Sequence, residues 1–287
     1  MKISVLIPTR GRTNVLCRGV DSVINNFYNL SNIELIFRFD NDDLDTLNHC
    51  MDYYQVEKKS ETSVTDEFKW GKSEFKVIDT ISKKYNISIK FIIGKRHGYV
   101  LLNRYYDEMA YISNGEYLLI WADDFELLDN SKYAGWDLLV SEGKGQLYLF
   151  VFDWNDGYPR VVPRKFYELN GRLCPNLLDD RYWMELSKVV DIFVRLDWKA
   201  DHHCQWDPGG DPLVDGRDVT AYEGRGEFIN NRRSGVENEW QFYDIEDFNR
   251  IENYLEEHPN YKKTSQTHDP KGLYGQELNR HPDCWKN

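Results

Sequence analysis

The chain has 287 residues, enough for one large domain or two smaller ones with a sizeable buried core. Hydrophobic residues make up 41% of it and aromatic residues 15%, which excludes a disordered composition. Thirty-six Lys and Arg against 48 Asp and Glu leave a formal net charge of −12. This charge opposes binding to nucleic acid or to an anionic bilayer, since both present dense phosphate charge. An anionic small substrate would need a local basic cluster or a bound cation.

The five cysteines are odd in number and contain no C-x-x-C pair, so they suggest neither a zinc site nor a redox motif. They fit a reducing compartment. The apolar run before Pro8 is too short for a signal-peptide core, and no later run reaches the roughly 18 apolar residues of a membrane span. We therefore expect a cytoplasmic protein without a membrane span, and the sequence does not set its oligomeric state.

The first elements predict a right-handed βαβ unit. Ile3–Ile7 is a continuous apolar run ended by Pro8, typical of a strand buried on both faces. Asn14–Asn26 carries one apolar stripe at helical spacing, and Ile33–Phe39 reads as a second buried strand. Strand, helix and strand in this order indicate parallel pairing.

The middle of the chain is less regular. Over residues 56–76 the hydrophobic pattern is interrupted and the sequence is highly charged, which predicts a mobile insertion or a poorly packed helix pair. Phe75–Tyr85 is expected to resume as a helix, and Ile87–Ile93 to form a third strand.

The alternation then continues. Leu101–Ile112 is expected to be a helix, and Tyr117–Trp121 and Leu147–Phe152 to be the fourth and fifth strands. This pattern predicts an α/β sheet over the first half of the chain. Glu237–Glu257 is expected to be a helix with an apolar face that includes Phe248 and Ile251.

Polar loops follow three of the expected strands, at residues 8–12, 40–43 and 122–124. In open α/β sheets, ligands bind beyond the carboxyl ends of the strands, although Asp and Asn are also ordinary turn residues. The adjacent carboxylates of Asp123 and Asp124 repel unless a cation shares them, and such hard oxygens suit Mg²⁺ or Mn²⁺. The alternative is a strand-end turn or a helix cap.

Three segments together resemble successive landmarks of the family 2 glycosyltransferases, which have the GT-A fold. They are ISVLIPTRGR, IELIFRFDNDD and GYVLLNRYYDEMAYISNGEYLLIWADDFELLD, and the resemblance covers roughly residues 3–129. It implies a Rossmann-like, mostly parallel sheet flanked by helices, with a loop-rich, acceptor-side C-terminal half. It also implies a hexosyltransferase-like enzyme that moves a sugar from a nucleotide diphosphate sugar, with UDP as the expected nucleotide, to a hydroxyl of a glycan or other acceptor with inversion.

The resemblance also implies three parts and a set of roles. Residues 1–155 would bind the nucleotide sugar, 156–235 the acceptor, with the catalytic base, and 236–287 would form a C-terminal helix and tail. The implied contacts to the nucleotide sugar come from Pro8, Thr9, Arg10, Asp40, Asp42, Asn103 and Asp123. Asp40 would face the uracil, and Asp123 or Asp124 would hold Mn²⁺ or Mg²⁺.

Some positions depart from the family pattern. Trp121 stands where many members have the first Asp of the metal motif, so the register of the ligand between Asp123 and Asp124 stays open. Asn41 and Asp42 replace the usual Asp-Gly pair.

Lys95, Arg96 and His97 form the local basic cluster that an acidic chain needs near a diphosphate. With Arg10 and Arg12 they could meet the pyrophosphate of the nucleotide. The alternative is a solvated surface turn.

The segment NLLDDRYWME, residues 176–185, resembles the acidic segment that carries the general base in inverting members. Asp180 is the candidate base, with Asp179 as the alternative register, because a carboxylate can take the proton of an attacking hydroxyl. A plain helix N-cap is the competing interpretation. His202 and His203 are candidate metal ligands, or simply packed or exposed histidines.

Five aromatic residues are candidates for stacking on sugar faces, with core packing as the default: Trp154, Tyr158, Trp183, Trp198 and Trp206. A non-catalytic carbohydrate- or nucleotide-binding module of the same fold is the alternative function. A nucleotidyltransferase is disfavoured, because the Gly-rich loop that such enzymes carry after the first strand is missing.

Overall fold

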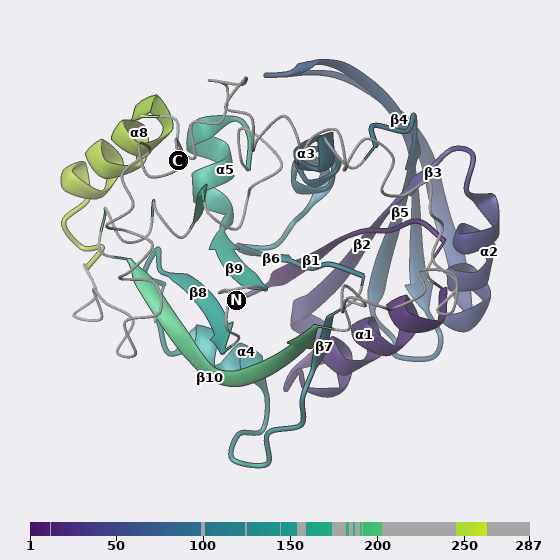
Figure 1. The fold of residues 1–287 in the computed structure, drawn as a ribbon, viewed down its shortest axis with the longest axis horizontal. Helices are drawn as coiled ribbons and strands as arrows, with labels where there is room; N and C mark the ends of the chain where they lie inside the picture. Colours follow the sequence, from purple (N-terminus) through teal and green to yellow (C-terminus); the bar gives the residue numbers. More distant parts are fainter. Residues whose placement is uncertain are drawn as a thin grey trace, which may run out of the picture.

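The computed structural model describes residues 1–11, 13–98, 101–123, 125–143, 145–153, 159–173, 182–183, 186, 190, 192–202 and 245–262. These residues form a ten-stranded sheet with helices on both faces (Figure 1). The centre of the sheet consists of four parallel strands, in the order β5 (Ser88–Gly94), β2 (Ile33–Asp40), β1 (Ile3–Pro8) and β6 (Tyr117–Ile120).

Further strands extend both sides of this parallel centre. Beyond β5 lies an antiparallel hairpin of β4 (Gly71–Ser82) and β3 (Val56–Phe68). Beyond β6 the order is β9 (Arg160–Pro163), β8 (Leu149–Asp153), β10 (Phe193–His202) and β7 (Phe125–Leu127). Of these, only β8 and β10 pair in parallel. The expected α/β sheet is confirmed, with four parallel strands at the centre and mostly antiparallel pairs outside.

The helices form two layers, because successive residues of the buried strands point to opposite faces. Val5 and Ile7 of β1 pack in one core with α1 (Thr13–Asn25), α2 (Leu44–Tyr53) and α4 (Trp136–Ser141). Leu6 packs in the other core, with α3 (Leu102–Ile112), α5 (Arg164–Asn170) and α8 (Ile245–Glu257). A short 3-10 turn, Leu30–Asn32, precedes β2.

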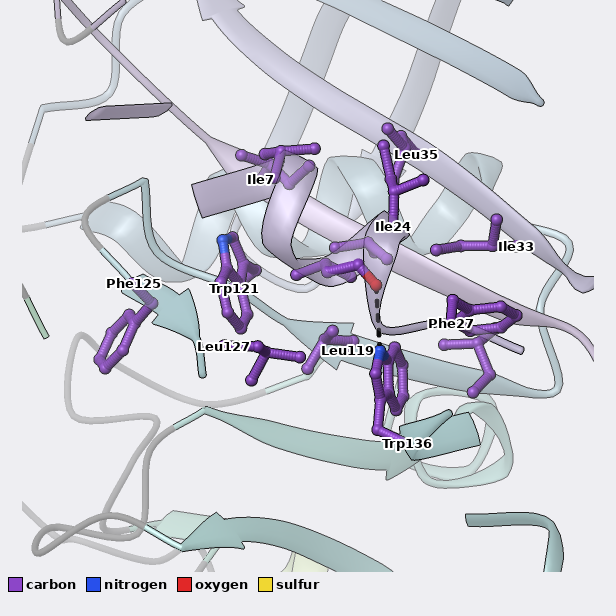
Figure 2. Close-up of a cluster of buried hydrophobic side chains, with 14 of the residues drawn as sticks. Ile7, Ile24, Phe27, Ile33, Leu35, Leu119, Trp121, Phe125, Leu127 and Trp136 are labelled. Atoms are coloured by element: carbon purple, nitrogen blue, oxygen red, sulfur yellow. Dashed lines mark hydrogen bonds between the residues drawn. The ribbon is translucent and has the colours of Figure 1, made fainter. Parts of the chain in front are cut away.

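Figure 2 shows part of the first core, where Trp121 and Trp136 lie among side chains of β1, β2 and α1. The indole N–H of Trp136 donates to the backbone oxygen of Val23 at 3.2 Å, so its only polar atom is satisfied. Phe27 packs edge-on against the same ring, with 5.1 Å between ring centroids. These large rings replace the aliphatic side chains that the composition lacks.

The strands expected at Ile3–Ile7, Ile33–Phe39, Ile87–Ile93 and Tyr117–Trp121, and the helices at Asn14–Asn26 and Leu101–Ile112, are confirmed within a few residues. The strand expected at Leu147–Phe152 corresponds to β8. Of the helix expected at Glu237–Glu257, the structure describes α8, in which Phe248 and Ile251 are buried as expected. None of the described helices combines the length and the apolarity that a membrane span requires.

The prediction for residues 56–85 was wrong. Neither an insertion nor a helix forms there, because β3 and β4 build a long hairpin whose tip curls over α3 (Figure 1). β3 is the outer strand, and residues 57–63 are exposed on both faces, so the sequence has no apolar periodicity to detect. In β4, Ser73, Phe75 and Val77 are buried alternately, which is the period of a strand rather than a helix.

Candidate functional site

The carboxyl ends of β1, β2, β5 and β6 meet at one edge of the sheet. Backbone hydrogen bonds join the segments that follow them: the Thr9 N–H donates to Arg38 O at 3.1 Å, and the Asn41 N–H to Gly94 O at 2.8 Å. The Trp121 N–H donates to Leu6 O at 3.1 Å. The structure therefore brings together the polar loops after these strands, as far as they are described, and with them the segment that begins at Lys95.

Asp40, the last residue of β2, lies at the centre of this edge and is only 4% exposed. Its Oδ1 accepts the Tyr105 hydroxyl at 2.7 Å and lies 3.6 Å from Arg38 Nη1. Its Oδ2 accepts Arg10 Nη1 at 3.2 Å and lies 4.0 Å from Arg96 Nε. Three guanidinium groups thus surround one buried carboxylate.

Burial dominates the protonation of Asp40 and raises its pKa above the ordinary value for aspartate. The hydrogen bond from Tyr105, followed by the charges of Arg38 and Arg10, opposes this rise. The nearby carboxylate of Asp42 adds to it.

Arg10 bridges the loops after β1 and β2. Its guanidinium binds Asp42 through two hydrogen bonds of 2.6 and 3.2 Å, in addition to its bond to Asp40. The hydrogen bond from Arg10 lowers the pKa of Asp42. The loop after β1 is also held by the Gly11 N–H, which donates to Asp43 Oδ2 at 3.1 Å. The predicted nucleotide-contact residues Pro8, Thr9, Arg10, Asp40 and Asp42 are therefore neighbours in space.

Asp123 follows β6 and is tied to the loop after β1. Its Oδ2 accepts the Thr9 hydroxyl at 3.1 Å, and both residues are buried. The antiparallel pairing of β7 with β10 places His202 opposite Phe125 in the register, two positions beyond Asp123. The described residues contain no group of three or more His, Cys, Asp or Glu that could hold a metal ion.

The predicted basic cluster has one exposed member and two that turn inward. Lys95 is exposed, whereas Arg96 approaches Asp40 as described above. His97 Nε2 lies 2.8 Å from Glu108 Oε1 on α3. The pyrophosphate role of Lys95 and Arg96 stays a prediction, while His97 belongs to a buried network.

That network was missed by the sequence analysis. Arg38 Nε donates to Glu108 Oε2 at 2.5 Å, and the Ser73 hydroxyl donates to Glu108 Oε1 at 2.5 Å. Burial alone would raise the pKa of Glu108, but the bond to His97, the Arg38 charge and the bond from Ser73 outweigh it and lower the pKa. Arg38 interrupts the apolar run of β2, and a charged residue in a buried strand is itself a signal that a partner lies nearby.

The structure tests the predicted roles of several residues little or not at all. Asn103 lies buried in the first turn of α3. Arg12, Asp124, Asp179, Asp180 and His203 lie outside the described residues, as do Trp154, Tyr158, Trp206 and the side chain of His202. Their roles stay predictions.

Trp183 and Trp198 pack in the core, which was the default for the five aromatic candidates, and do not stack on a sugar. They are 0% and 2% exposed and belong to the two cores. Trp183 stacks on Phe166 with 5.9 Å between centroids, and the Trp198 indole N–H donates to Leu128 O at 2.9 Å. A fully buried ring has no face left for a ligand.

No family model matches the chain, and no curated protein matches its sequence. Two of the solved structures to which it is similar hold a bound nucleotide sugar. TarS of S. aureus (residues 1–349), in complex with UDP-GlcNAc, is 11% identical over 68% of this chain and 56% of that chain, with a TM-score of 0.45. The mannosyltransferase PcManGT from Pyrobaculum calidifontis, in complex with GDP-Man and Mn²⁺, is 10% identical over 68% of this chain and 54% of that chain, with a TM-score of 0.47. The chain thus spans little more than half the length of these proteins.

Proposed function

We propose that the chain is a metal-dependent, inverting glycosyltransferase that moves a sugar from a nucleotide diphosphate sugar to an acceptor hydroxyl, with UDP as the expected nucleotide. The observation that carries the proposal is the position of Asp40. It is a buried carboxylate at the carboxyl end of β2, hydrogen-bonded to Arg10 from the loop after β1 and close to Arg96 after β5. Loops that meet at such an edge bind ligands in open α/β sheets.

The charges of the edge suit a nucleotide. The chain carries a formal charge of −12, so a diphosphate needs local cations. Arg10 and Arg96 supply them beside Asp40, and Lys95 would add a third from the segment after β5. Asp40 would accept an N–H group of the base. Pro8 and Thr9 would line the base and ribose, and Asp42 and Asn103 would add further contacts.

In this proposal Asp123 would be a ligand of Mn²⁺ or Mg²⁺. Its carboxylate offers hard oxygen ligands at the strand end, is oriented by Thr9, and lies two positions from the residue that pairs with His202. Asp124 or His203 would complete the protein ligands, and phosphate oxygens would take further positions. Such an ion would neutralise the negative charge that develops on the departing diphosphate.

Asp180, or Asp179 in the alternative register, would act as the general base. A carboxylate on the face opposite to the leaving group can take the proton of the acceptor hydroxyl as it attacks the anomeric carbon, which gives inversion. In this proposal residues 1–155 bind the nucleotide sugar and residues 156–235 bind the acceptor. Residues 236–287 form the C-terminal helix and tail. The expected location is the cytoplasm.

A non-catalytic carbohydrate- or nucleotide-binding module is the second candidate, because Trp121 stands where a metal-binding Asp is common. UDP release from a panel of UDP-sugars with Mn²⁺ separates the two functions. The parent chain should release UDP, and Asp123→Asn, Asp124→Asn and Asp180→Asn should lower the rate by about a hundredfold or more. Asp52→Asn, an exposed carboxylate on α2, serves as the matched control and should keep the parent rate. A parent chain that binds glycans or UDP without ever releasing UDP from a UDP-sugar would support the module instead.

A further inference from the structure

The hydroxyl oxygen of Tyr105 connects helix α3 to the carboxyl end of β2 and to the segment after β5. It lies in the first half of α3 and is 7% exposed. Its hydroxyl donates to Asp40 Oδ1 at 2.7 Å and accepts the backbone N–H of His97 at 2.8 Å and of Gly98 at 3.0 Å. A phenol oxygen has one hydrogen and two lone pairs, so these three bonds use all of its capacity.

This saturation fixes the direction of the hydroxyl hydrogen. A tyrosine hydroxyl normally rotates to suit its neighbours, but here both lone pairs are occupied by N–H groups of the chain. The hydrogen can therefore point only toward Asp40, and Oδ1 of Asp40 is held in one place. The two consecutive backbone N–H groups of His97 and Gly98 thus converge on the same oxygen.

The ring of Tyr105 is also held on both sides. The guanidinium of Arg38 lies over it, 4.8 Å from the ring centroid, and the His97 ring meets it edge-on at 5.1 Å. Both neighbours bind Glu108, which is fully buried. Movement of the ring would therefore require a buried ion pair to break.

Resting on the proposed function, we propose that Tyr105 is a positioning residue for the nucleotide: it holds the Asp40 carboxylate and the 95–98 segment in one fixed arrangement. The base contact at the end of β2 and the phosphate contacts after β5 lie on different elements. Tyr105 bonds directly to Asp40 and to the backbone of the two residues that follow Arg96. A nucleotide then meets groups that are already arranged, so that little binding energy is lost in ordering them.

Tyr105→Phe tests this role, because it keeps the packed ring and removes only the oxygen. Tyr117→Phe is the matched control: Tyr117 is also buried, but its hydroxyl donates to Gln146 O at the opposite end of the parallel strands. UDP binding in the presence of Mn²⁺, measured by titration calorimetry, should weaken about tenfold in Tyr105→Phe, the loss expected for a hydrogen bond to a charged group. Tyr117→Phe should bind like the parent.

The pH dependence separates positioning from a general loss of structure. The bond from Tyr105 lowers the pKa of Asp40, so its removal raises that pKa, while Arg10, Arg38, Arg96 and Asp42 still face the carboxylate in both proteins. The loss of UDP affinity on acidification should therefore begin at a higher pH in Tyr105→Phe than in the parent. A structural defect would weaken binding by the same factor at every pH.

Amide hydrogen exchange provides a measurement that needs no ligand. The N–H groups of His97 and Gly98 should exchange faster in Tyr105→Phe, while those of β5 keep their parent rates. Unchanged exchange at these two amides, or UDP affinity equal to the parent, would overturn the positioning role alone. A parent chain that binds no nucleoside diphosphate would overturn both this role and the proposed function.

Discussion

Arg38 and Glu108 form an ion pair of 2.5 Å whose two side chains are completely buried. Arg38 comes from the parallel centre of the sheet and Glu108 from the helix that covers it, 70 residues later in the chain. Serine and histidine partners, Ser73 and His97, satisfy the second oxygen of Glu108. The pair therefore fastens the hairpin strand β4, the central strand β2, the segment after β5 and helix α3 at one point.

Glu108→Ala should destabilise the fold strongly. It leaves the Arg38 guanidinium buried without its carboxylate, and removing one partner of a buried ion pair costs about 3–5 kcal/mol. Urea denaturation measures the change in the free energy of unfolding. Glu67→Ala, at an exposed position of β3, is the control and should stay within about 0.5 kcal/mol of the parent. Equal losses in the two variants would show that the buried pair adds nothing to stability.

The buried strands of the fold could be predicted from the sequence because their apolar runs are continuous. Ile3–Ile7 and Ile33–Phe39 lie at the centre of a sheet that is covered on both faces, so every residue in them is buried and most are apolar. Residues 56–68 form the outer strand, where no face is buried for most of its length, and nothing local distinguishes such a charged strand from a loop. Its pairing with β4 depends on contacts that the sequence alone does not display.

The residues of the candidate site also include some that could be predicted from the sequence and some that could not. Thr9, Asp40 and Asp123 could be selected because each stands directly after an expected strand, and their proximity follows from parallel pairing. Tyr105 and Glu108 could not, because their partners lie on other elements, and a helix carries many polar residues with no ligand nearby. Register and helix docking, rather than composition, bring these side chains to the site.

Asp107 should make stability depend on pH between about 4 and about 8. Burial raises its pKa to about 8, although the Leu173 N–H at 2.7 Å and the Trp70 indole N–H at 3.1 Å oppose the rise. A folded pKa above the unfolded value means that the folded state holds the proton more tightly, so this group lowers stability as pH rises from about 4 to about 8. Asp107→Asn removes the titration, and the difference in unfolding free energy, variant minus parent, should increase over this interval by up to about 1.4 kcal/mol per pH unit and level off above pH 8.

Thermal and urea unfolding at several values of pH between 5 and 9 would measure that difference for Asp107→Asn. Asp52→Asn, at an exposed position, gives the baseline for a changed net charge. Loss of an acceptor for Trp70 adds a constant offset to the Asp107 variant and leaves the slope intact. Parallel stability curves for parent and variant would mean that Asp107 titrates in the folded chain as it does in the unfolded one.

Lys84 should stabilise the fold through a cage of tyrosines. Its Nζ lies 3.7 Å from the ring centroid of Tyr53 and 4.8 Å from that of Tyr85, and 3.0 Å from Asp21 Oδ2 on α1. Lys84→Met keeps the apolar stem and removes the charge, which should cost about 1–2 kcal/mol of unfolding free energy. Lys83→Met, the adjacent and 63% exposed lysine, should change it by less than about 0.5 kcal/mol. Indistinguishable variants in urea denaturation would assign the cage no net energy.

Thr9 should tune the metal site of the proposed enzyme. Its hydroxyl holds Asp123 Oδ2 at 3.1 Å, and partners that orient a ligating carboxylate typically change metal affinity by 10–100-fold when they are removed. Thr9→Val keeps the shape of the side chain without the hydroxyl, so the Mn²⁺ concentration that gives half-maximal UDP release should rise about tenfold. Thr9→Ser restores the hydroxyl and should bring the value back toward that of the parent. If valine and serine gave the same Mn²⁺ dependence as threonine, Asp123 would need no orienting partner, and its assignment as the metal ligand would lose its structural support.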